Sequence, residues 1–277
     1  MRLNINNEYS PLKKVAVCCG SSVPQAENYR TDDPEELKYG WKNWNKDLFL
    51  EQQGAFFDKL SQYGVEVVRL ESDPELIHQA YTRDVGFVIG HKFFYAEKRT
   101  LKSRQGEIKK LIKTIKMSKD KFQALHGKIE GGDVIIVKDH ALVGISHRTD
   151  LEAIAELSKF TPVKTLYLGE DIMHLDTRLT LLPNNYVLAY MDVFTEKDKE
   201  YLKSNYKIIE VTKEEAEGLA TNVFVVNPET IFVEKKQERV ANELRKRGFN
   251  IESLDYSEPI AIGGSFRCTT LPLVRES

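Results

Sequence analysis

The residues of this 277-residue chain with the most chemical capacity are a thiol, an imidazole and three carboxylates. Each stands at or just before the start of an apolar segment: Asp84 in TRD, Glu130 in IEGGD, His174 and Asp176 in HLDT, and Cys268 in GGSFRC. A thiol beside an imidazole can act as an activated nucleophile, and a third polar group can orient the base. If the fold brings these side chains together, they predict an active site with Cys268 as nucleophile.

Taken singly, each residue also has a simpler explanation. Asp84 could pair with the neighbouring arginine, and Glu130 could be a solvated turn residue before two glycines. Cys268 could be a small buried hydrophobe. His174 and Asp176 are two residues apart, so in a strand they would share a face and could bind a metal. All of these residues occupy the same position within a repeated sequence pattern. Separate structural explanations for each residue would not account for that shared position.

A β-hairpin pattern recurs along the chain and would position these residues. Apolar or aromatic runs interrupted by turn residues begin at Val85, Asp133, Arg178, Asn222 and Gly263. The starts are 41 to 48 residues apart. A period in the range of about 20–50 residues indicates a propeller or solenoid. The fifth copy has one strand only, and the N-terminal run 12–20 could complete it and close a ring.

Helical patterns separate the hairpins, so each unit resembles ββαβ. They cover residues 47–63, 104–116, 151–160, 196–204 and 235–247, with short strands expected at 65–70, 163–168, 207–211 and 250–254. The segment after Met117 has no clear pattern. The polar segment 21–46 lies outside the repeat and is either a functional loop or a plain surface loop. The prediction is one α/β domain, residues 1–277, with five modules and pseudo-fivefold symmetry.

Composition narrows the range of partners and the cellular location. The net charge is −2, which gives no reason to expect nucleic acid or an anionic membrane as partner. No apolar run approaches the roughly 20 residues of a membrane span, and the first residues lack the apolar core of a signal peptide. Three cysteines do not suggest a disulfide framework, so we expect a cytoplasmic protein with free thiols. Cys18 and Cys19 are expected to pack inside the closing strand, and a homo-oligomer is compatible with the sequence.

The motifs, in their order and spacing, resemble a known group of enzymes. TRD, IEGGDVIIV, GISHRT, HLDT and GGSFRCTTLPLVR are similar to segments of the guanidino-group-modifying enzymes of the pentein superfamily. That superfamily includes arginine deiminase, glycine amidinotransferase and dimethylarginine dimethylaminohydrolase. The resemblance extends from Asp84 to Arg275. It implies a five-bladed α/β propeller, a small guanidino substrate, and no metal or other cofactor.

The resemblance also implies a role for each residue at the start of a hairpin. Cys268 would be the nucleophile, and His174 the general acid and base. Glu130 would orient the imidazole or hold a guanidinium nitrogen. Asp84 and Asp176 would hold the guanidinium group, whose planar fork matches paired carboxylates.

Two arginines are implied to bind a carboxylate on the substrate. Arg148, in GISHRT, resembles the superfamily arginine with this task, and Arg104 is a weaker candidate. Because Arg148 follows the second hairpin, a ring of modules would place it at the mouth of the cavity. The chain departs from its relatives at two places. Arg267 stands where a histidine often precedes the nucleophile, and Asp176 stands where the dimethylarginine hydrolases commonly carry lysine. The compact length resembles those hydrolases, whereas Asp176 resembles the deiminases and amidinotransferases.

The implied reaction passes through a covalent thiouronium on Cys268. Water attack would make the protein a hydrolase of linear amidines, and amine attack would make it an amidinotransferase. Hydrolysis is favoured because the chain is short and water needs no acceptor site. Two other classes stay open: a metal-dependent hydrolase using His174, Asp176, Asp84 and Glu130, and a non-catalytic binding module of the same fold.

Overall fold

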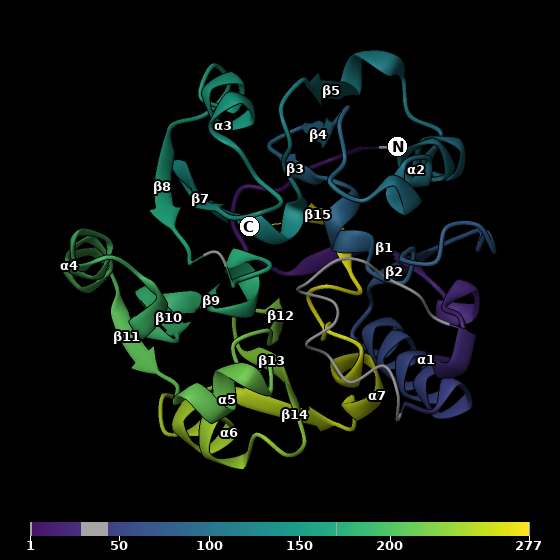
Figure 1. The fold of residues 1–277 in the computed structure, drawn as a ribbon. Coiled ribbons are helices and arrows are strands. Elements are labelled where there is room, and N and C mark those ends of the chain that lie inside the picture. The colour runs from purple at the N-terminus through teal and green to yellow at the C-terminus, as the bar shows by residue number, and fades with distance from the viewer. Residues whose placement is uncertain (1, 29–43, 170, 277) are drawn as a thin grey trace.

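The chain folds into five three-stranded sheets arranged around a common centre (Figure 1). The computed structural model describes residues 2–28, 44–169 and 171–276. Most of the segment 21–46, including its tryptophan at position 41, therefore lies outside the described residues. The α/β class and the five modules predicted from the hairpin repeat are confirmed.

Four modules share one pattern, in which two antiparallel strands are followed by a helix and a third strand parallel to the second. The first is β3 (Phe87–Ile89), β4 (Lys92–Ala96), α2 (Glu107–Ile115) and β5 (Phe122–Leu125). The second is β6 (Val134–Val137), β7 (His140–Ile145), α3 (Leu151–Leu157) and β8 (Val163–Tyr167). The third is β9 (Leu179–Leu181), β10 (Tyr186–Ala189), α4 (Glu196–Asn205) and β11 (Lys207–Glu210). The fourth is β12 (Phe224–Asn227), β13 (Thr230–Glu234), α6 (Glu238–Arg245) and β14 (Asn250–Leu254).

The fifth module joins the two ends of the chain. Its central strand β1 (Leu12–Cys18) pairs antiparallel with β15 (Leu271–Arg275) and parallel with β2 (Glu66–Leu70). Helix α1 (Lys46–Gln62) connects β1 to β2. The prediction that the N-terminal run completes the last module is thus confirmed.

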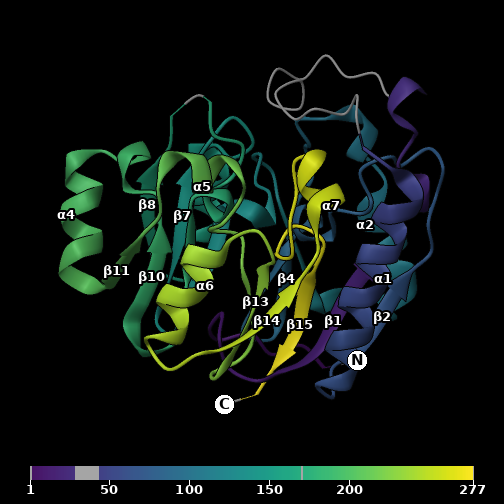
Figure 2. The same ribbon diagram turned by 90° about the horizontal axis from the view of Figure 1, so that it is seen from below.

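Helices lie on the outer side of the sheets, with α4 and α1 at opposite edges of the molecule (Figure 2). Helix α6 shows why: Val240, Ala241 and Leu244 are buried on one face, at the spacing that a helix needs for an apolar stripe. The apolar side chains of the strands form clusters between neighbouring modules. These contacts hold the starts of the hairpins at one end of the assembly.

Three elements were not predicted. Strand β5 follows Met117, and two five-residue helices, α5 (Lys213–Glu217) and α7 (Ser257–Ala261), come after β11 and β14. Helices this short have no measurable apolar period, although α5 begins with a capping box between Thr212 and Glu215. In the part of the chain that the structure describes, no helix has the length and apolarity to cross a membrane.

Candidate active site

Short 3-10 turns precede the first strand in three modules and carry polar side chains inward. They are Thr82–Val85, Gly131–Asp133 and Leu175–Thr177. Glycines allow these turns to approach each other closely. A methyl group at Gly131 would lie 2.2 Å from the carbonyl oxygen of Arg83, and one at Gly132 would lie 2.7 Å from the ring of His174. The two glycines of IEGGD are therefore required by packing, Gly131 against the backbone of the turn at Arg83 and Gly132 against the imidazole.

The turns surround a small cavity of about 20 Å³. Its lining includes Cys268, His174, Asp84, Arg104 and Arg148, all singled out from the sequence. Cys268, His174 and Glu130 were expected to line one cavity; the structure places the thiol and the imidazole there, but Glu130 is not among the lining residues. Glu130 and Asp176 are fully buried and lie behind the lining.

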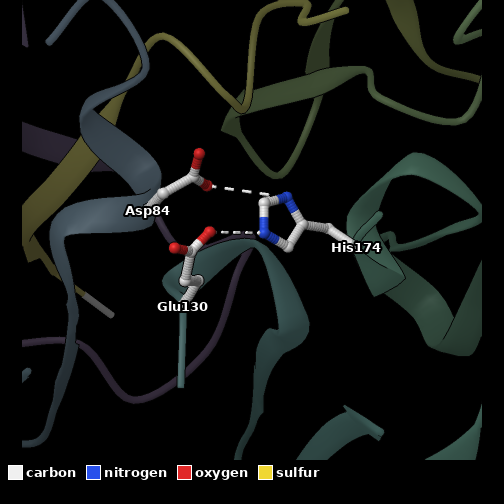
Figure 3. Close-up of side chains that lie close together, drawn as sticks. All are labelled: Asp84, Glu130 and His174. Atoms are coloured by element: carbon white, nitrogen blue, oxygen red, sulfur yellow. Dashed lines mark hydrogen bonds and ion pairs between the residues drawn. The ribbon is translucent and has the colours of Figure 1, made fainter. Parts of the chain in front are cut away.

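His174 is held between two carboxylates (Figure 3). Its Nε2 lies 2.8 Å from Oε2 of Glu130, and its Nδ1 lies 3.7 Å from Oδ1 of Asp84. Burial disfavours the charged imidazolium, but Asp84 and the hydrogen bond to Glu130 outweigh burial and raise the pKa of His174 to about 10. The ring is therefore charged at neutral pH and can act as an acid.

Glu130 is ionised because guanidinium groups surround it. Nη2 of Arg99 lies 3.2 Å from Oε1, and Nη1 of Arg148 lies 3.4 Å from Oε2. Burial opposes ionisation, but Arg99, Arg148 and the hydrogen bond from His174 hold the pKa of Glu130 well below its usual range. Arg99 was not predicted, because it lies in an irregular segment between β4 and α2.

The metal alternative meets an electrostatic obstacle. Asp84, Glu130 and His174 each place one ligand atom within 4.8 Å of the others, which is the grouping that a metal ion would need. A metal binds imidazole only in its neutral form. A metal ion would therefore have to displace the proton that Asp84 and Glu130 hold on this ring by raising the pKa of His174. Asp176, the fourth residue of that hypothesis, is not part of the group.

Arg104 is occupied with protein acceptors. Its guanidinium donates to Asp84 Oδ2 at 2.8 Å, to Glu107 Oε2 at 3.1 Å, and to the carbonyl oxygens of Tyr81 and His78. These four bonds use most of its five N–H groups. Its geometry therefore suits orienting Asp84 better than binding a substrate carboxylate.

Arg148 lies deeper than expected. The sequence placed it at the cavity mouth, whereas the side chain is 1% exposed and contacts Glu130 within the wall. Burial follows from the Asp133 carboxylate, which accepts hydrogen bonds from Ser146 Oγ and Thr149 Oγ1 on either side of Arg148. The expected position at the mouth is wrong, but the residue lines the cavity as predicted.

Asp133 was missed as a site residue, although it ends the IEGGD motif. Besides the loop of Arg148, its Oδ1 accepts the backbone N–H of Leu175 at 2.9 Å, the residue after His174. Burial raises the pKa of Asp133 to about 6, against the opposing effect of His174. Asp133 thus ties the imidazole turn of one module to the arginine loop of another.

Asp176 faces Arg267. Its Oδ2 accepts from Nε of Arg267 at 3.4 Å, and among the described residues its Oδ1 has no hydrogen-bond partner. Burial raises the pKa of Asp176, and Arg267 offsets part of that effect. Arg267, at the position where the enzymes that the motifs resemble often carry histidine, is therefore a cation paired with the Asp176 carboxylate.

Cys268 lies in the turn before β15, not within an apolar strand. Its side chain is 4% exposed, and its Sγ lies 3.5 Å from Oδ1 of Asn222, the polar residue at the start of the fourth hairpin. Burial raises the pKa of the thiol well above its usual value, and Asp176 and Asp84 add to the rise. Without a cation in the cavity, the thiol is neutral.

The other two cysteines differ in their exposure to solvent. Cys18 ends β1 and is buried, as expected, with its thiol pKa raised to about 12, mainly by burial. Cys19 is exposed, so its expected packing inside the strand is wrong. The strand stops at Cys18, and the next residue begins the turn to Gly20–Ser22. Cys19 is therefore the thiol that reagents in solution meet first.

Comparisons with known proteins agree with this geometry. Residues 28–275 match the family model described as eukaryotic N,N dimethylarginine dimethylhydrolase. An uncharacterised Bacillus subtilis protein, YkgA, is 35% identical and aligns over 97% of this chain and 94% of its own. Pseudomonas aeruginosa dimethylarginine dimethylaminohydrolase is 26% identical over 80% of this chain and 87% of that one.

Solved structures share the fold at low identity. The N-terminal domain of ArgZ, covalently bound to a reaction intermediate, aligns with a TM-score of 0.84 and 20% identity, covering 95% of this chain and 98% of that one. The amidinotransferase SxtG of Microseira wollei aligns with a TM-score of 0.81 and 20% identity, covering 99% and 98%.

Proposed function

Because the chain belongs to the dimethylarginine dimethylaminohydrolase family of the pentein superfamily, we propose that Cys268 attacks the guanidinium carbon of an arginine-like substrate. The protein is a guanidino-modifying hydrolase or amidinotransferase. The observation that carries the proposal is the shared cavity of Cys268 and His174, with Asp84 beside them. A thiol, a charged imidazole and a carboxylate are what attack, leaving-group protonation and cation binding require.

Substrate binding begins the reaction. The guanidinium cation relieves the repulsion that Asp84 and Asp176 exert on a thiolate, so the pKa of Cys268 falls and its proton leaves to solvent. The thiolate then forms a C–S bond to the guanidinium carbon. The resulting tetrahedral adduct carries no net charge at its centre.

His174 completes the first half. Its imidazolium donates a proton to the departing amine, the C–N bond breaks, and a thiouronium cation remains on Cys268. The neutral imidazole then takes a proton from water as its oxygen attacks the same carbon. The C–S bond breaks, and a ureido product and the free thiol are released.

Hydrolysis fits the space available better than amidino transfer. The cavity is only about 20 Å³, and Cys268, which lines it, is almost fully buried. Water needs no binding place of its own, whereas an amine acceptor does. An assay with arginine, with and without added amines, separates the two: hydrolysis yields ammonia and a ureido product, and transfer yields an amidinated amine.

We treat residues 1–277 as one catalytic unit. Each module supplies one polar residue at the start of its first strand: Asp84, Glu130, His174, Asn222 and Cys268. A piece that lacks any module would lack one of these groups.

Arginine-like substrates without N-methyl groups are expected to be preferred. Among the described residues, Oδ1 of Asp84 and Oδ1 of Asp176 both lack a hydrogen-bond partner. Each can accept an N–H from the substrate, and methylation would remove such donors. Each charge-assisted bond contributes about 1.5–3 kcal/mol. We therefore expect kcat/KM for arginine to exceed that for asymmetric dimethylarginine at least about tenfold, measured with both substrates in competition.

The family match supports the opposite preference, since the Pseudomonas relative is named for dimethylarginine. Asp176→Lys provides the sharper comparison, because lysine is common there in the dimethylarginine hydrolases. If the parent chain prefers dimethylarginine and Asp176→Lys leaves that preference unchanged, the proposed role of Asp176 is wrong.

Arg148→Ala is expected to raise KM for guanidino acids about tenfold to a hundredfold, because it removes a charge-assisted contact to the substrate carboxylate. KM for alkylguanidines that lack a carboxylate should change little. Arg245→Ala, at an exposed position of α6, is the surface control. Equal losses for both substrate types would mean that Arg148 acts through Glu130 instead.

A further inference from the structure

A buried carboxylate from the N-terminal segment lies beneath the site. Glu8 is 4% exposed, and the segment is held by bridges from Ile5 to Gly90 and from Asn4 to Val274. Oε1 of Glu8 accepts the backbone N–H of Ile136 at 3.1 Å, and Oε2 accepts Nη1 of Arg267 at 3.0 Å. Glu8 precedes the residues that match the family model, which begin at position 28.

Arginines surround Glu8 on several sides. Burial opposes its ionisation, but Arg267, Arg83 and Arg275 together lower the pKa of Glu8 to about 2. Only Arg267 among these is hydrogen-bonded to it, so the remaining guanidinium groups act at longer range. The Glu8 carboxylate is therefore ionised at all ordinary pH values, and its attraction for the Arg267 guanidinium does not change with pH.

Arg267 is shared between two carboxylates. Its Nη1 binds Glu8 at 3.0 Å, while its Nε reaches Asp176 at the longer distance of 3.4 Å. Among the described residues, neither Nη2 of Arg267 nor Oδ1 of Asp176 makes a hydrogen bond. A guanidinium and a carboxylate this close ordinarily form a two-pronged pair. The stronger contact to Glu8 coincides with an incomplete pair at Asp176.

We propose that Glu8 is a positioning residue, which restrains Arg267 so that Asp176 keeps one carboxylate oxygen for the substrate cation. The proposal rests on the proposed function, in which Asp176 binds a guanidinium nitrogen. When the charge at position 8 is removed by substitution, Arg267 is released to form a two-pronged pair with Asp176. That pair competes with the substrate for the same oxygen.

Loss of the Glu8 charge then has two effects of opposite sign. Asp176 is better neutralised, so it repels the Cys268 thiolate less, and the free enzyme becomes easier to alkylate. Asp176 is also less available to the substrate, so KM rises. A purely structural role would loosen the packing around the buried Cys268 and speed its alkylation in Arg267→Gln as well, whereas the proposal expects slower alkylation in that variant.

The pKa of the Cys268 thiol reports on the charge state of Asp176 and Arg267, provided that the other charged neighbours of the thiol are unchanged. The ionisable groups that share its cavity or act on its charge are Asp84, Asp176, His174, Arg83, Arg267, Tyr256, His78, Tyr81, Arg104 and Arg148. None of them is changed in Glu8→Gln. Cys19→Ser serves as the parent because Cys19 is exposed.

The first experiment measures iodoacetamide alkylation of Cys268 against pH, by mass spectrometry of its peptide. Glu8→Gln should lower the apparent thiol pKa by about one unit, which is about a tenfold faster reaction below that pKa. KM for arginine should rise about tenfold with kcat nearly unchanged. Glu234→Gln, at a buried glutamate of β13 that binds the backbone of Lys236, is the control and should match the parent. An unchanged thiol pKa or an unchanged KM in a folded Glu8→Gln would overturn the proposal.

The second experiment tests whether Glu8 acts through Arg267. Arg267→Gln should raise the thiol pKa, and Glu8→Gln/Arg267→Gln should give the same value. The double variant removes both partners of the pair, so it leaves no uncompensated charge at this contact and decides the matter if Glu8→Gln alone does not fold. A further shift between these two variants would overturn the proposal. Alkylation requires no turnover, so it gives its answer even if Cys268 proves not to be the nucleophile.

Discussion

Cys268→Ser is expected to lose turnover by several orders of magnitude while its fold is retained. A hydroxyl is far less acidic than a thiol and a weaker nucleophile towards a delocalised guanidinium carbon. The substitution changes little in size, and a serine hydroxyl can still donate to Oδ1 of Asn222, which lies 3.5 Å from Sγ. The measurement is product formation from arginine, with circular dichroism and thermal unfolding to verify the fold.

The covalent step has its own readout. Mass spectrometry of quenched turnover should find a substrate-derived adduct on the peptide that contains Cys268. A halo-amidine reagent should inactivate the wild-type protein and Cys19→Ser equally, because the exposed Cys19 reacts without consequence. Wild-type turnover by Cys268→Ser, or inactivation that depends on Cys19, would remove the nucleophile from the mechanism.

His174→Ala is expected to reduce kcat by about 10²–10⁴, the range for loss of a positioned general acid and base. A substrate whose leaving group needs no proton should still form the covalent adduct. That adduct should then accumulate, because water attack also needs the imidazole. If the leaving group makes no difference to His174→Ala, then His174 supports Glu130 and Asp84 structurally and does not transfer protons.

The pH dependence has a definite sign. The pKa of His174 is raised to about 10, so the imidazolium is present through neutral pH and is lost as pH rises through that value. kcat/KM should therefore fall on the alkaline side, and His174→Ala should lack that fall. The same charge stabilises the fold below the ordinary histidine pKa, and this contribution is lost as pH rises towards about 10. Glu130→Gln should move both transitions to lower pH, because it removes a negative partner.

The modular fold was predictable because each hairpin carries its own local signal. Turn residues such as Asn184-Asn185, both with positive φ, interrupt β-branched runs at regular intervals. The pairing of β1 with β15 was predictable because the last copy lacked a second strand. Cys268 and His174 were found in one cavity because they stood at the same phase of the repeat.

The charges that tune these residues were not predictable in the same way. Arg99 approaches Glu130 from an irregular segment, and Glu8 reaches Arg267 from an N-terminal stretch without a motif. Neither lies at the repeat phase that identified the others. Their partners are 31 and 259 residues away in the sequence, and nothing local in the chain specifies such contacts. The repeat placed Arg148 at the mouth of the cavity, whereas its side chain is buried. A sequence repeat predicts where a residue lies around the central axis, but not how deeply its side chain is buried.

The pairing of β1 with β15 also sets the order in which the site can form during synthesis. The earlier modules can build their sheets as the ribosome releases them, because the contacts within each are local. β15 follows the four other modules in the chain, and it completes its sheet against β1, which precedes them. Cys268 stands directly before β15, so the thiol takes its place beside the imidazole only in this final long-range step. A nascent chain of four modules would therefore display the carboxylates and the imidazole without a nucleophile, and would not react with guanidino compounds until β15 pairs with β1.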